Sequence, residues 1–306
     1  MNIRIGTRGS KLALWQAHFV QDLLQADGLT TEIVTIETKG DQVLDRSLSK
    51  IGSKGVFTQE LEDGLFDASI DIAVHSAKDL QSELPDDLEL IAFTERELVN
   101  DVLVSRQPRS LQSGERFVIG TSSTRRIALL KHFFPHIRTV EMRGNLQTRL
   151  RKLDEGQCDA LLLAYAGVHR MGYDDLIVEM LPAEPFVPAV GQGSIAVECA
   201  KSLDEAKKSR IRALVNHPET EVCLLAERAF LRRLQGGCSI PVFGLATHDD
   251  GYITLTGGLI SLDGDHLLSE YVVGSAAHAE GMGTALGDEI LQLGGAQLLA
   301  EIKRSL

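Results

Sequence analysis

Three stretches of the sequence place arginine next to glycine and hydroxyl residues where an apolar, strand-like run gives way to a helical pattern. Residues 120–126 read Gly-Thr-Ser-Ser-Thr-Arg-Arg, residues 143–145 read Arg-Gly-Asn with Arg149 one turn further on, and residues 8–10 read Arg-Gly-Ser. Free backbone N–H groups and the positive end of the helix dipole suit such turns to anions. The planar guanidinium fork matches a carboxylate better than the point charge of lysine does.

The pair Arg125 and Arg126 is the most informative part of this pattern. Two cations in the first turn of a helix oppose its dipole unless an anion compensates them, although the hydroxyls there could simply cap the helix. All three junctions would lie at the carboxyl ends of parallel strands, where open α/β sheets bind ligands. They therefore predict a ligand with several carboxylates or phosphates. The candidate residues at these junctions are Arg8, Ser10, Thr121, Ser122, Ser123, Arg125, Arg126, Arg143 and Arg149.

A further strand, expected at 70–74, runs into His75-Ser76-Ala77-Lys78-Asp79. No Gly-x-Ser-x-Gly elbow surrounds Ser76, so a serine hydrolase is not indicated. An ionised Asp79 next to Lys78 could stabilise a developing cation or move a proton. Alternatively, Asp79 is a turn residue that accepts hydrogen bonds from the backbone.

Four widely spaced cysteines show no Cys-x-x-Cys pair, and free thiols are expected. Cys158, Cys199 and Cys223 lie in apolar stretches expected to be regular elements, where a thiol is usually a small core group. Cys238 follows Gly236-Gly237 beyond a helix that carries several arginines, so it is a candidate reactive thiol.

Composition excludes several classes of protein. The 306 residues carry a formal net charge of -12, which disfavours nonspecific binding to nucleic acid or anionic membrane. Residues 125–152 nevertheless hold eight basic side chains against one acid. No apolar run approaches the roughly 20 residues of a membrane helix, and the start of the chain lacks a signal-peptide pattern, so a cytoplasmic protein is expected. No metal-binding spacing of histidines appears, and Gly191-Gln192-Gly193 precedes a strand rather than opening a helix, which argues against a dinucleotide site.

Apolar periodicity predicts two α/β domains followed by a smaller α+β domain. The expected strands are 3–6, 32–36, 70–74, 88–93, 102–104, 117–120, 137–142, 160–163, 195–198, 242–247, 252–260 and 267–273. The expected helices are 11–26, 56–66, one from the 121–123 turn to about 134, 145–155, one near Arg170, 220–234 and 279–302. Pro182, Pro185 and Pro188 indicate a crossing between domains. Residues 40–55 are expected to form a long loop, and they contain Arg46, Lys50 and Lys54. This segment is predicted to be a mobile lid or, alternatively, a plain surface loop.

Six of these motifs, in the same order, resemble those of the porphobilinogen deaminase family along nearly the whole chain. They are 7–17 (TRGSKLALWQA), 71–79 (DIAVHSAKD), 120–126 (GTSSTRR), 143–145 (RGN), 188–193 (PAVGQG) and 227–238, from Glu-Arg-Ala-Phe to Gly-Gly-Cys.

The resemblance implies an enzyme that joins four porphobilinogen molecules head to tail, releases an ammonia each time, and gives hydroxymethylbilane for tetrapyrrole synthesis. It implies a dipyrromethane cofactor held by a thioether to Cys238, with Asp79 as the catalytic residue. The other matching positions bind cofactor and substrate side chains: Lys78, Thr121, Ser122, Ser123, Arg125, Arg126 and Gly193 for the cofactor, and Arg8, Ser10, Arg143, Arg149 and Arg170 for the substrate. The family enzyme is expected to be a monomer.

The family fold implied is two α/β domains that resemble periplasmic binding proteins around a cleft, plus a small C-terminal α+β domain. The corresponding segments are 1–94 with 191–212 returning, 95–190, and 213–306. This chain departs from the family with Thr124 for Leu, Lys39 for Arg, Gln81 for Pro, and a different turn at 97–100. A competing hypothesis is a noncatalytic two-lobed protein that binds a small anion, which would need neither Cys238 nor Asp79.

Overall fold

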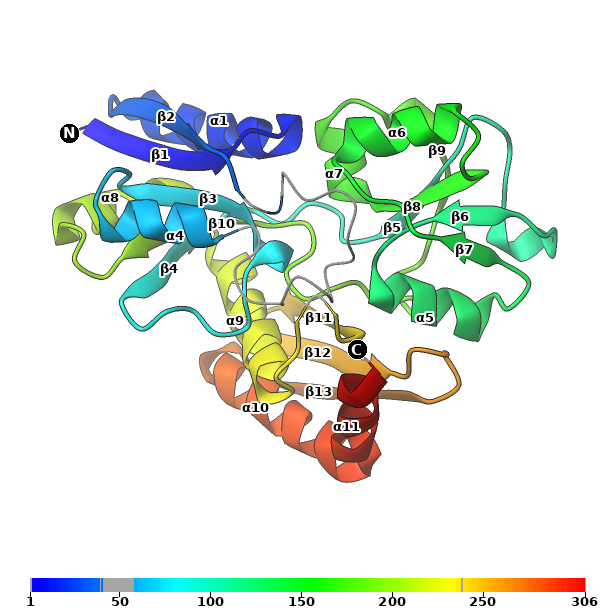
Figure 1. Ribbon diagram of the computed structural model, residues 1–306. Coiled ribbons are helices and arrows are strands. Elements are labelled where there is room, and N and C mark those ends of the chain that lie inside the picture. The colour runs from blue at the N-terminus through cyan, green and yellow to red at the C-terminus, as the bar shows by residue number, and fades with distance from the viewer. Residues whose placement is uncertain (1, 39, 41–57, 238, 306) are drawn as a thin grey trace.

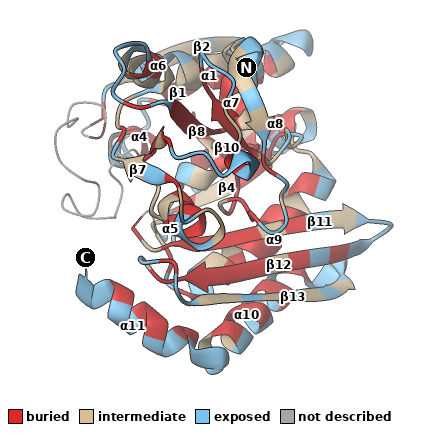
Figure 2. Ribbon diagram, turned by 90° about the vertical axis from the view of Figure 1, so that its right-hand side faces the viewer, coloured by how far each residue is buried: buried red, intermediate tan, exposed pale blue. Residues whose placement is uncertain are grey.

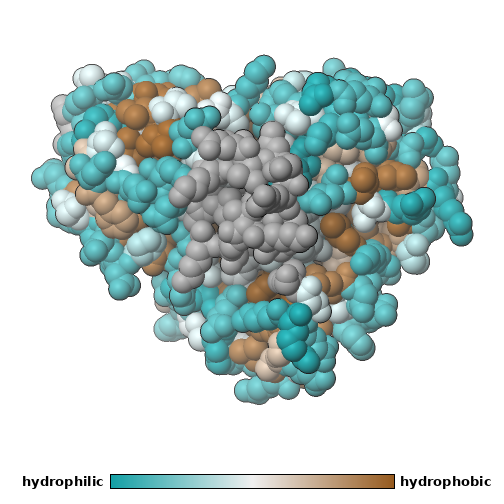
Figure 3. Space-filling model, in the orientation of Figure 1, coloured by the Kyte–Doolittle hydropathy of each residue, from teal (hydrophilic) through white to brown (hydrophobic). Residues whose placement is uncertain are grey.

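Two mixed α/β units lie side by side above a third, smaller unit (Figure 1). The structure is a computed structural model that describes residues 2–38, 40, 58–237 and 239–305. Each unit has its own sheet, and the described apolar side chains gather in separate cores beside those sheets. The face shown in Figure 3 is accordingly mostly hydrophilic, with hydrophobic side chains in small groups. The predicted fold class, two α/β units with a small α+β unit, is confirmed.

The first unit is a five-stranded sheet in the order β2-β1-β3-β10-β4. Its strands are β1 (Asn2–Arg8), β2 (Thr30–Ile36), β3 (Ile72–Ser76), β4 (Leu88–Phe93) and β10 (Ile195–Ala200). Strand β1 is parallel to β2 and β3, whereas β10 runs antiparallel to both β3 and β4. The helices of this unit are α1 (Lys11–Ala26), α4 (Gln59–Phe66) and α8 (Glu205–Val215), with the short 3₁₀ turn η1 (Ala77–Asp79) after β3.

Helix α1 shows why the sequence folds as it does here. Ser10 caps it by accepting a hydrogen bond from the Ala13 backbone N–H, and its buried residues, Ala17, Val20 and Leu24 among them, recur at helical spacing. The predicted bounds of this helix, 11–26, are confirmed.

The second unit has the strand order β7-β6-β8-β5-β9. Its strands are β5 (Asp101–Val104), β6 (Val118–Gly120), β7 (Arg138–Val140), β8 (Ala160–Ala164) and β9 (Ile177–Met180). Its helices are α5 (Thr124–Phe133), α6 (Leu146–Asp154) and α7 (Tyr165–Arg170), with 3₁₀ turns η2 (Leu111–Ser113) and η3 (Asp174–Leu176). Strand β6 is parallel to β7 and β8, and β5 runs antiparallel to β8 and β9.

The antiparallel strands bring two more chain segments to the edge where the parallel strands end. Asp101, the first residue of β5, pairs with Ala164 at the end of β8. Ile195, the first residue of β10, pairs with Ser76 at the end of β3. Both strands are entered from chain crossings between the two sheets, 94–100 and 181–194, so these crossings adjoin the same edge.

The third unit is an antiparallel sheet covered by helices on one face (Figure 2). Its elements are α9 (Pro218–Arg233), β11 (Val242–Asp249), β12 (Tyr252–Ile260), β13 (Leu267–Ser275), the 3₁₀ turn η4 (Ala276–His278), α10 (Ala279–Ile290) and α11 (Ala296–Ser305). The predicted single helix over 279–302 is broken at a π turn, Leu291–Gly295, because Gly294 adopts a φ of 109°. No helix in the described part of the chain is long and apolar enough to span a membrane.

Candidate functional site

The hydroxyls of the 121–123 turn serve local structure between β6 and α5. Ser123 caps α5 by accepting a hydrogen bond from the Arg126 N–H, and the Ser122 hydroxyl accepts one from the Met142 N–H at 3.0 Å. Buried Thr121 accepts from the Ser123 N–H at 3.3 Å. The capping interpretation therefore holds for Ser123, whereas Thr121 and Ser122 accept other backbone hydrogen bonds, and contact of the three with a cofactor stays a prediction.

Arg125 and Arg126 are compensated by an acid from the same chain, Asp101. One carboxylate oxygen of Asp101 accepts from Arg125 Nη2 at 2.6 Å, and the other accepts from Arg126 Nη2 at 2.6 Å. Only 1% of Asp101 is exposed. Burial by itself would raise the pKa of Asp101, but the two guanidinium groups outweigh it and hold this pKa well below its usual range. The sequence analysis missed Asp101, whose only signal is an acid at the start of an apolar strand.

Lys78 and Asp79 lie on the turn η1 at the end of β3, across from Asp101. Lys78 Nζ donates to Gln192 Oε1 at 3.3 Å, and Gln192 Nε2 donates to Asp101 Oδ1 at 3.0 Å. Burial and then repulsion by Arg126 lower the pKa of Lys78 to about 8, although Asp79 opposes the shift. The Lys78 ammonium is therefore only partly compensated by negative charge, and a ligand carboxylate would supply the rest. Gln192 is a second residue that the sequence analysis missed.

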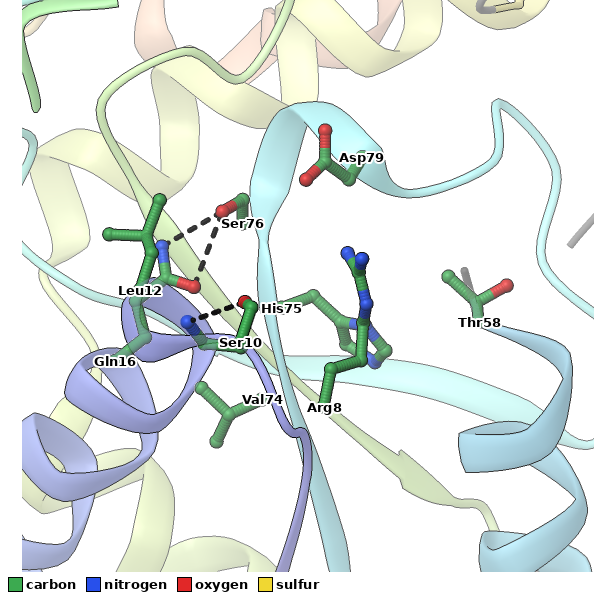
Figure 4. Close-up of a pocket in the computed structure, with 10 residues that line it drawn as sticks. Arg8, Ser10, Leu12, Gln16, Thr58, Val74, His75, Ser76 and Asp79 are labelled. Atoms are coloured by element: carbon green, nitrogen blue, oxygen red, sulfur yellow. Dashed lines mark hydrogen bonds between the residues drawn. The ribbon is translucent and has the colours of Figure 1, made fainter. Parts of the chain in front are cut away.

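Asp79 is exposed and lines a pocket on the first unit (Figure 4). Arg8, Ser10 and Ser76 line the same pocket, so the predicted residues Arg8, Ser10 and Asp79, which come from two separate motifs, come together there. Ser10 and Ser76 are also held internally, since the Ser10 hydroxyl caps α1 and Gln16 Nε2 donates to Ser76 at 2.8 Å. Behind them, His75 Nε2 lies 3.0 Å from a buried oxygen of Glu198.

Glycine is required in the crossing that leads into β10. Gly191 has a φ of 77°, and a Cβ there would lie 2.8 Å from the Ala77 carbonyl carbon. Gly193 has a φ of 96°, and a Cβ there would lie 2.5 Å from the Glu97 carbonyl oxygen. Gly191 lets this crossing pass directly against the turn that carries Lys78 and Asp79, and Gly193 lets it pass against the other crossing, 94–100.

Arg143 and Arg149 add positive charge from the second unit. Arg149 Nε donates to the Gly144 carbonyl at 2.8 Å, and Arg143 Nη1 is buried without an acceptor among the described residues. Burial and repulsion by Arg126 lower the pKa of Arg149 to about 10, and attraction to Asp79 opposes this shift. A site that binds an anionic ligand is expected to contain such groups: a buried guanidinium N–H without an acceptor, and two cations whose pKa values are lowered.

The crossings are anchored to the third unit through one buried carboxylate, Glu227 of α9. Its two oxygens accept from Arg96 Nη1 at 2.5 Å and Nη2 at 3.1 Å. They also accept from the backbone N–H groups of Gly191 and Ala246, each at 2.8 Å. Glu227 thus joins both crossings to β11.

Cys238 lies outside the described residues, as do residues 41–55 of the predicted lid. The other three cysteines are free and buried, as predicted, although Cys158 precedes β8 rather than lying in a regular element. Burial raises the pKa values of Cys199 and Cys223 to about 12, so these thiols are poor nucleophiles near neutral pH. Among the described residues, no cluster of three or more His, Cys, Asp or Glu could hold a metal ion.

Comparisons with known proteins agree with this chemistry. Residues 3–235 match the family described as "Porphobilinogen deaminase, dipyromethane cofactor binding domain", and residues 221–292 match "Porphobilinogen deaminase, C-terminal domain". The porphobilinogen deaminase of Cytophaga hutchinsonii is 58% identical over 99% of this chain and 98% of its own length. That of Desulfosudis oleivorans is 57% identical, with 99% of each chain covered. A periplasmic substrate-binding protein from Coxiella burnetii is similar at 14% identity and a TM-score of 0.45, over 71% of this chain and 92% of that one. The chain belongs to the porphobilinogen deaminase family.

Proposed function

We infer that the chain is a hydroxymethylbilane synthase, a transferase that condenses four porphobilinogen molecules and releases four molecules of ammonia. The observation that carries this inference is the exposed carboxylate of Asp79 among desolvated cations, Lys78, Arg126 and Arg149. Each porphobilinogen brings an acetate and a propionate, which need such cations, and a pyrrole ring, which needs a carboxylate when it becomes cationic. A noncatalytic anion-binding protein is not favoured, because relatives 57–58% identical over the whole chain are porphobilinogen deaminases.

Asp79 is the catalytic residue in this proposal. Its carboxylate accepts hydrogen bonds from pyrrole N–H groups and stabilises the positive charge that develops on the substrate ring as ammonia leaves. Lys78, the preceding residue, and Arg149 are both attracted to this carboxylate, and they pair with ligand carboxylates.

Arg8, Ser10, Arg143, Arg149 and Arg170 bind the substrate side chains in this proposal. Arg143 is the best supported of these, because its buried Nη1 has no acceptor among the described residues. Arg149 already donates Nε to Gly144, which fixes its guanidinium plane for a ligand at the remaining nitrogens.

A dipyrromethane cofactor, attached through Cys238, would supply the ring to which the first porphobilinogen is joined, and each later porphobilinogen would be joined to the ring added before it. The residues proposed to hold it are Lys78, Thr121, Ser122, Ser123, Arg125, Arg126 and Gly193. These residues fit a group with several carboxylates. Nearby negative charge compensates the Lys78 ammonium only in part, and Arg126 shares the Asp101 carboxylate with Arg125. Arg125 itself has its Nη groups on Asp101 and the Val187 carbonyl, so only its Nε, which is buried without an acceptor among the described residues, is left for the cofactor.

The remaining assignments form part of the same proposal. The first domain comprises 1–94 with 191–212, the second 95–190 and the third 213–306, and they carry the catalytic aspartate, the arginine-rich site and the cysteine loop. The enzyme acts as a cytoplasmic monomer on a small-molecule substrate, without nucleic acid or membrane partners, in keeping with a net charge of -12.

The mass of the denatured, active enzyme tests the proposal most directly. It should exceed the sequence mass by two pyrrole units, and Cys238→Ser should lose both the added mass and the activity. Cys223→Ser is the matched control, because that thiol is buried, and it should keep the added mass. An unmodified mass in active wild-type protein would refute the covalent cofactor.

A further inference from the structure

Arg170, the last residue of α7, touches parts of the protein that are far apart in sequence. Its Nη2 donates to the Gly193 carbonyl at 2.7 Å, and its guanidinium carbon lies 5.4 Å from the centre of the Trp15 ring. Trp15 belongs to α1 of the first unit, Arg170 to the second, and Gly193 to the crossing between them. Arg170 therefore joins both units at their junction.

The two helices involved are neighbours. Figures 1 and 2 place α7 beside α1, and the helices are in contact. A Cβ on Gly167 of α7 would lie 3.6 Å from a methyl carbon of Leu12, an ordinary van der Waals separation. The contact between Trp15 and Arg170 thus belongs to a packed interface between the units.

Trp15 is held in place from its own unit. It is half-buried against the core formed by α1 and the first sheet, and its ring stacks on Phe19 with centroids 5.5 Å apart and planes 10° from parallel. A tryptophan face within about 6 Å of a guanidinium is the most favourable aromatic partner for that cation. The ring therefore offers Arg170 a fixed surface against which its planar group can lie.

Arg170 keeps unused hydrogen-bonding capacity in this position. No residue of the described part of the chain accepts a hydrogen bond from its Nε or Nη1. Burial lowers the pKa of Arg170, with Glu97 opposing the shift, yet an arginine stays protonated near neutral pH. The guanidinium is thus a partly desolvated cation that has a carbonyl and a ring as partners but lacks a hydrogen-bonded carboxylate.

We propose that Trp15 is a positioning residue for substrate binding: its ring fixes the plane of the Arg170 guanidinium so that an N–H group without an acceptor among the described residues, on Nε or on Nη1, can donate to a substrate carboxylate. The bond to Gly193 sets the position of the group, and the ring sets its orientation. This proposal rests on the proposed role of Arg170 in binding substrate.

A double-mutant cycle tests whether Trp15 acts through Arg170. Trp15→Leu should lower kcat/KM for porphobilinogen by about three- to thirtyfold, the range that corresponds to a partly desolvated cation–π pair. Trp15→Phe should retain more activity than Trp15→Leu. In an Arg170→Gln background, Trp15→Leu should cause no further loss, because the group that it orients is gone. Phe66→Leu is the matched control, because it removes an exposed aromatic ring at the end of α4, and it should stay near wild type.

Fluorescence supplies a readout that does not depend on turnover, because Trp15 is the only tryptophan in the sequence. In the cofactor-loaded enzyme, Arg170→Gln should change the emission maximum of Trp15 and increase its quenching by iodide. The Phe66→Leu and Arg106→Gln variants provide comparison spectra: Phe66 is exposed at the end of α4, and Arg106 pairs with exposed Asp154 away from this junction.

The outcomes separate the two proposals. If Arg170→Gln has wild-type kinetics, the assigned substrate role of Arg170 is wrong. If Arg170→Gln is impaired but Trp15→Leu is not, or if the two losses multiply in the double variant, Trp15 does not position Arg170. An unchanged Trp15 spectrum in Arg170→Gln would equally overturn the stacking.

Discussion

Replacing Asp101 with asparagine should destabilise the protein far more than the loss of an ordinary ion pair. The carboxylate is 1% exposed and accepts from Arg125, from Arg126 twice, and from Gln192, at 2.6 to 3.1 Å. Asparagine keeps the shape of the side chain but removes the charge and one acceptor oxygen. Two buried guanidinium groups would then repel each other without compensation.

The magnitude follows from the burial of the group. Breaking a buried ion pair by removing one partner costs about 3–5 kcal/mol, because the other charge stays desolvated. The matched control is Asp154→Asn, which breaks the pair with Arg106, whose two side chains are 48% and 50% exposed. A surface pair of that kind contributes about 0–1 kcal/mol. Urea denaturation of the two cofactor-loaded variants and of the wild type, monitored by circular dichroism, measures the difference in the free energy of unfolding.

Acidification gives an independent check with a defined sign. The pKa of Asp101 is lowered in the folded protein, so its stabilisation is complete above its unfolded value of about 4 and is lost as pH falls from there through the folded value. The stability gap between wild type and Asp101→Asn should therefore be constant near neutral pH and shrink under strong acid. If Asp101→Asn costs no more than Asp154→Asn at pH 7, the reasoning about the shared carboxylate is wrong.

Three further changes probe the site itself. Asp79→Asn should fold and load cofactor but lose on the order of 10² to 10³ in kcat, and a variant that kept a tenth of the wild-type rate in a turnover assay would contradict the catalytic role. Arg149→Lys should stall chain growth, because lysine cannot keep the bond to Gly144 and a planar fork toward the substrate together; native mass spectrometry showing the normal set of intermediates would count against this. Gln81→Pro should lower the free energy of unfolding by only about 1–2 kcal/mol in urea titrations. The ψ of Leu80 is already 145°, a value that suits the residue before proline, and only the hydrogen bonds from the Gln81 side-chain amide to Thr58 and Glu62 are lost. A loss of activity as large as that of Asp79→Asn would refute this.

Local patterns predicted most elements because those elements have local causes. The strands 88–93 and 252–260 were predicted with their observed bounds, because each is a run of strand-favouring residues between turn residues. Strand β9 and helix α8 were not predicted. The residues of β9 alternate between half-buried and exposed, and the buried face of α8 holds Lys208 together with Ile211 and Val215, so neither gives a strong periodic signal.

The candidate site was only partly predictable, because its second half depends on strand direction. The arginine-bearing turns could be found from their own residues. Asp101 and Gln192 could not, since they reach the site only because β5 and β10 run antiparallel to their neighbours and so begin where β8 and β3 end. No local sequence pattern reports that direction. Glu227 could not be predicted from local sequence either. Its four donors are two N–H groups of Arg96 and the backbone N–H groups of Gly191 and Ala246, which come from both crossings and β11.

The placement of Asp101 also changes what the adjacent arginines can do. One carboxylate shared by two guanidinium groups satisfies the local geometry yet leaves one positive charge over. Lys78, Arg143 and Arg149 add three more, and Asp79 removes one of them. The described residues of the site therefore keep an excess of positive charge. Burial and then this charge lower the pKa of Lys78 and of Arg149, and an anionic ligand would relieve the excess. Had each arginine its own internal acid, no positive charge would be left over for a ligand carboxylate. With a single shared acid, the pair is fixed in place and still leaves one positive charge, as the proposed function requires.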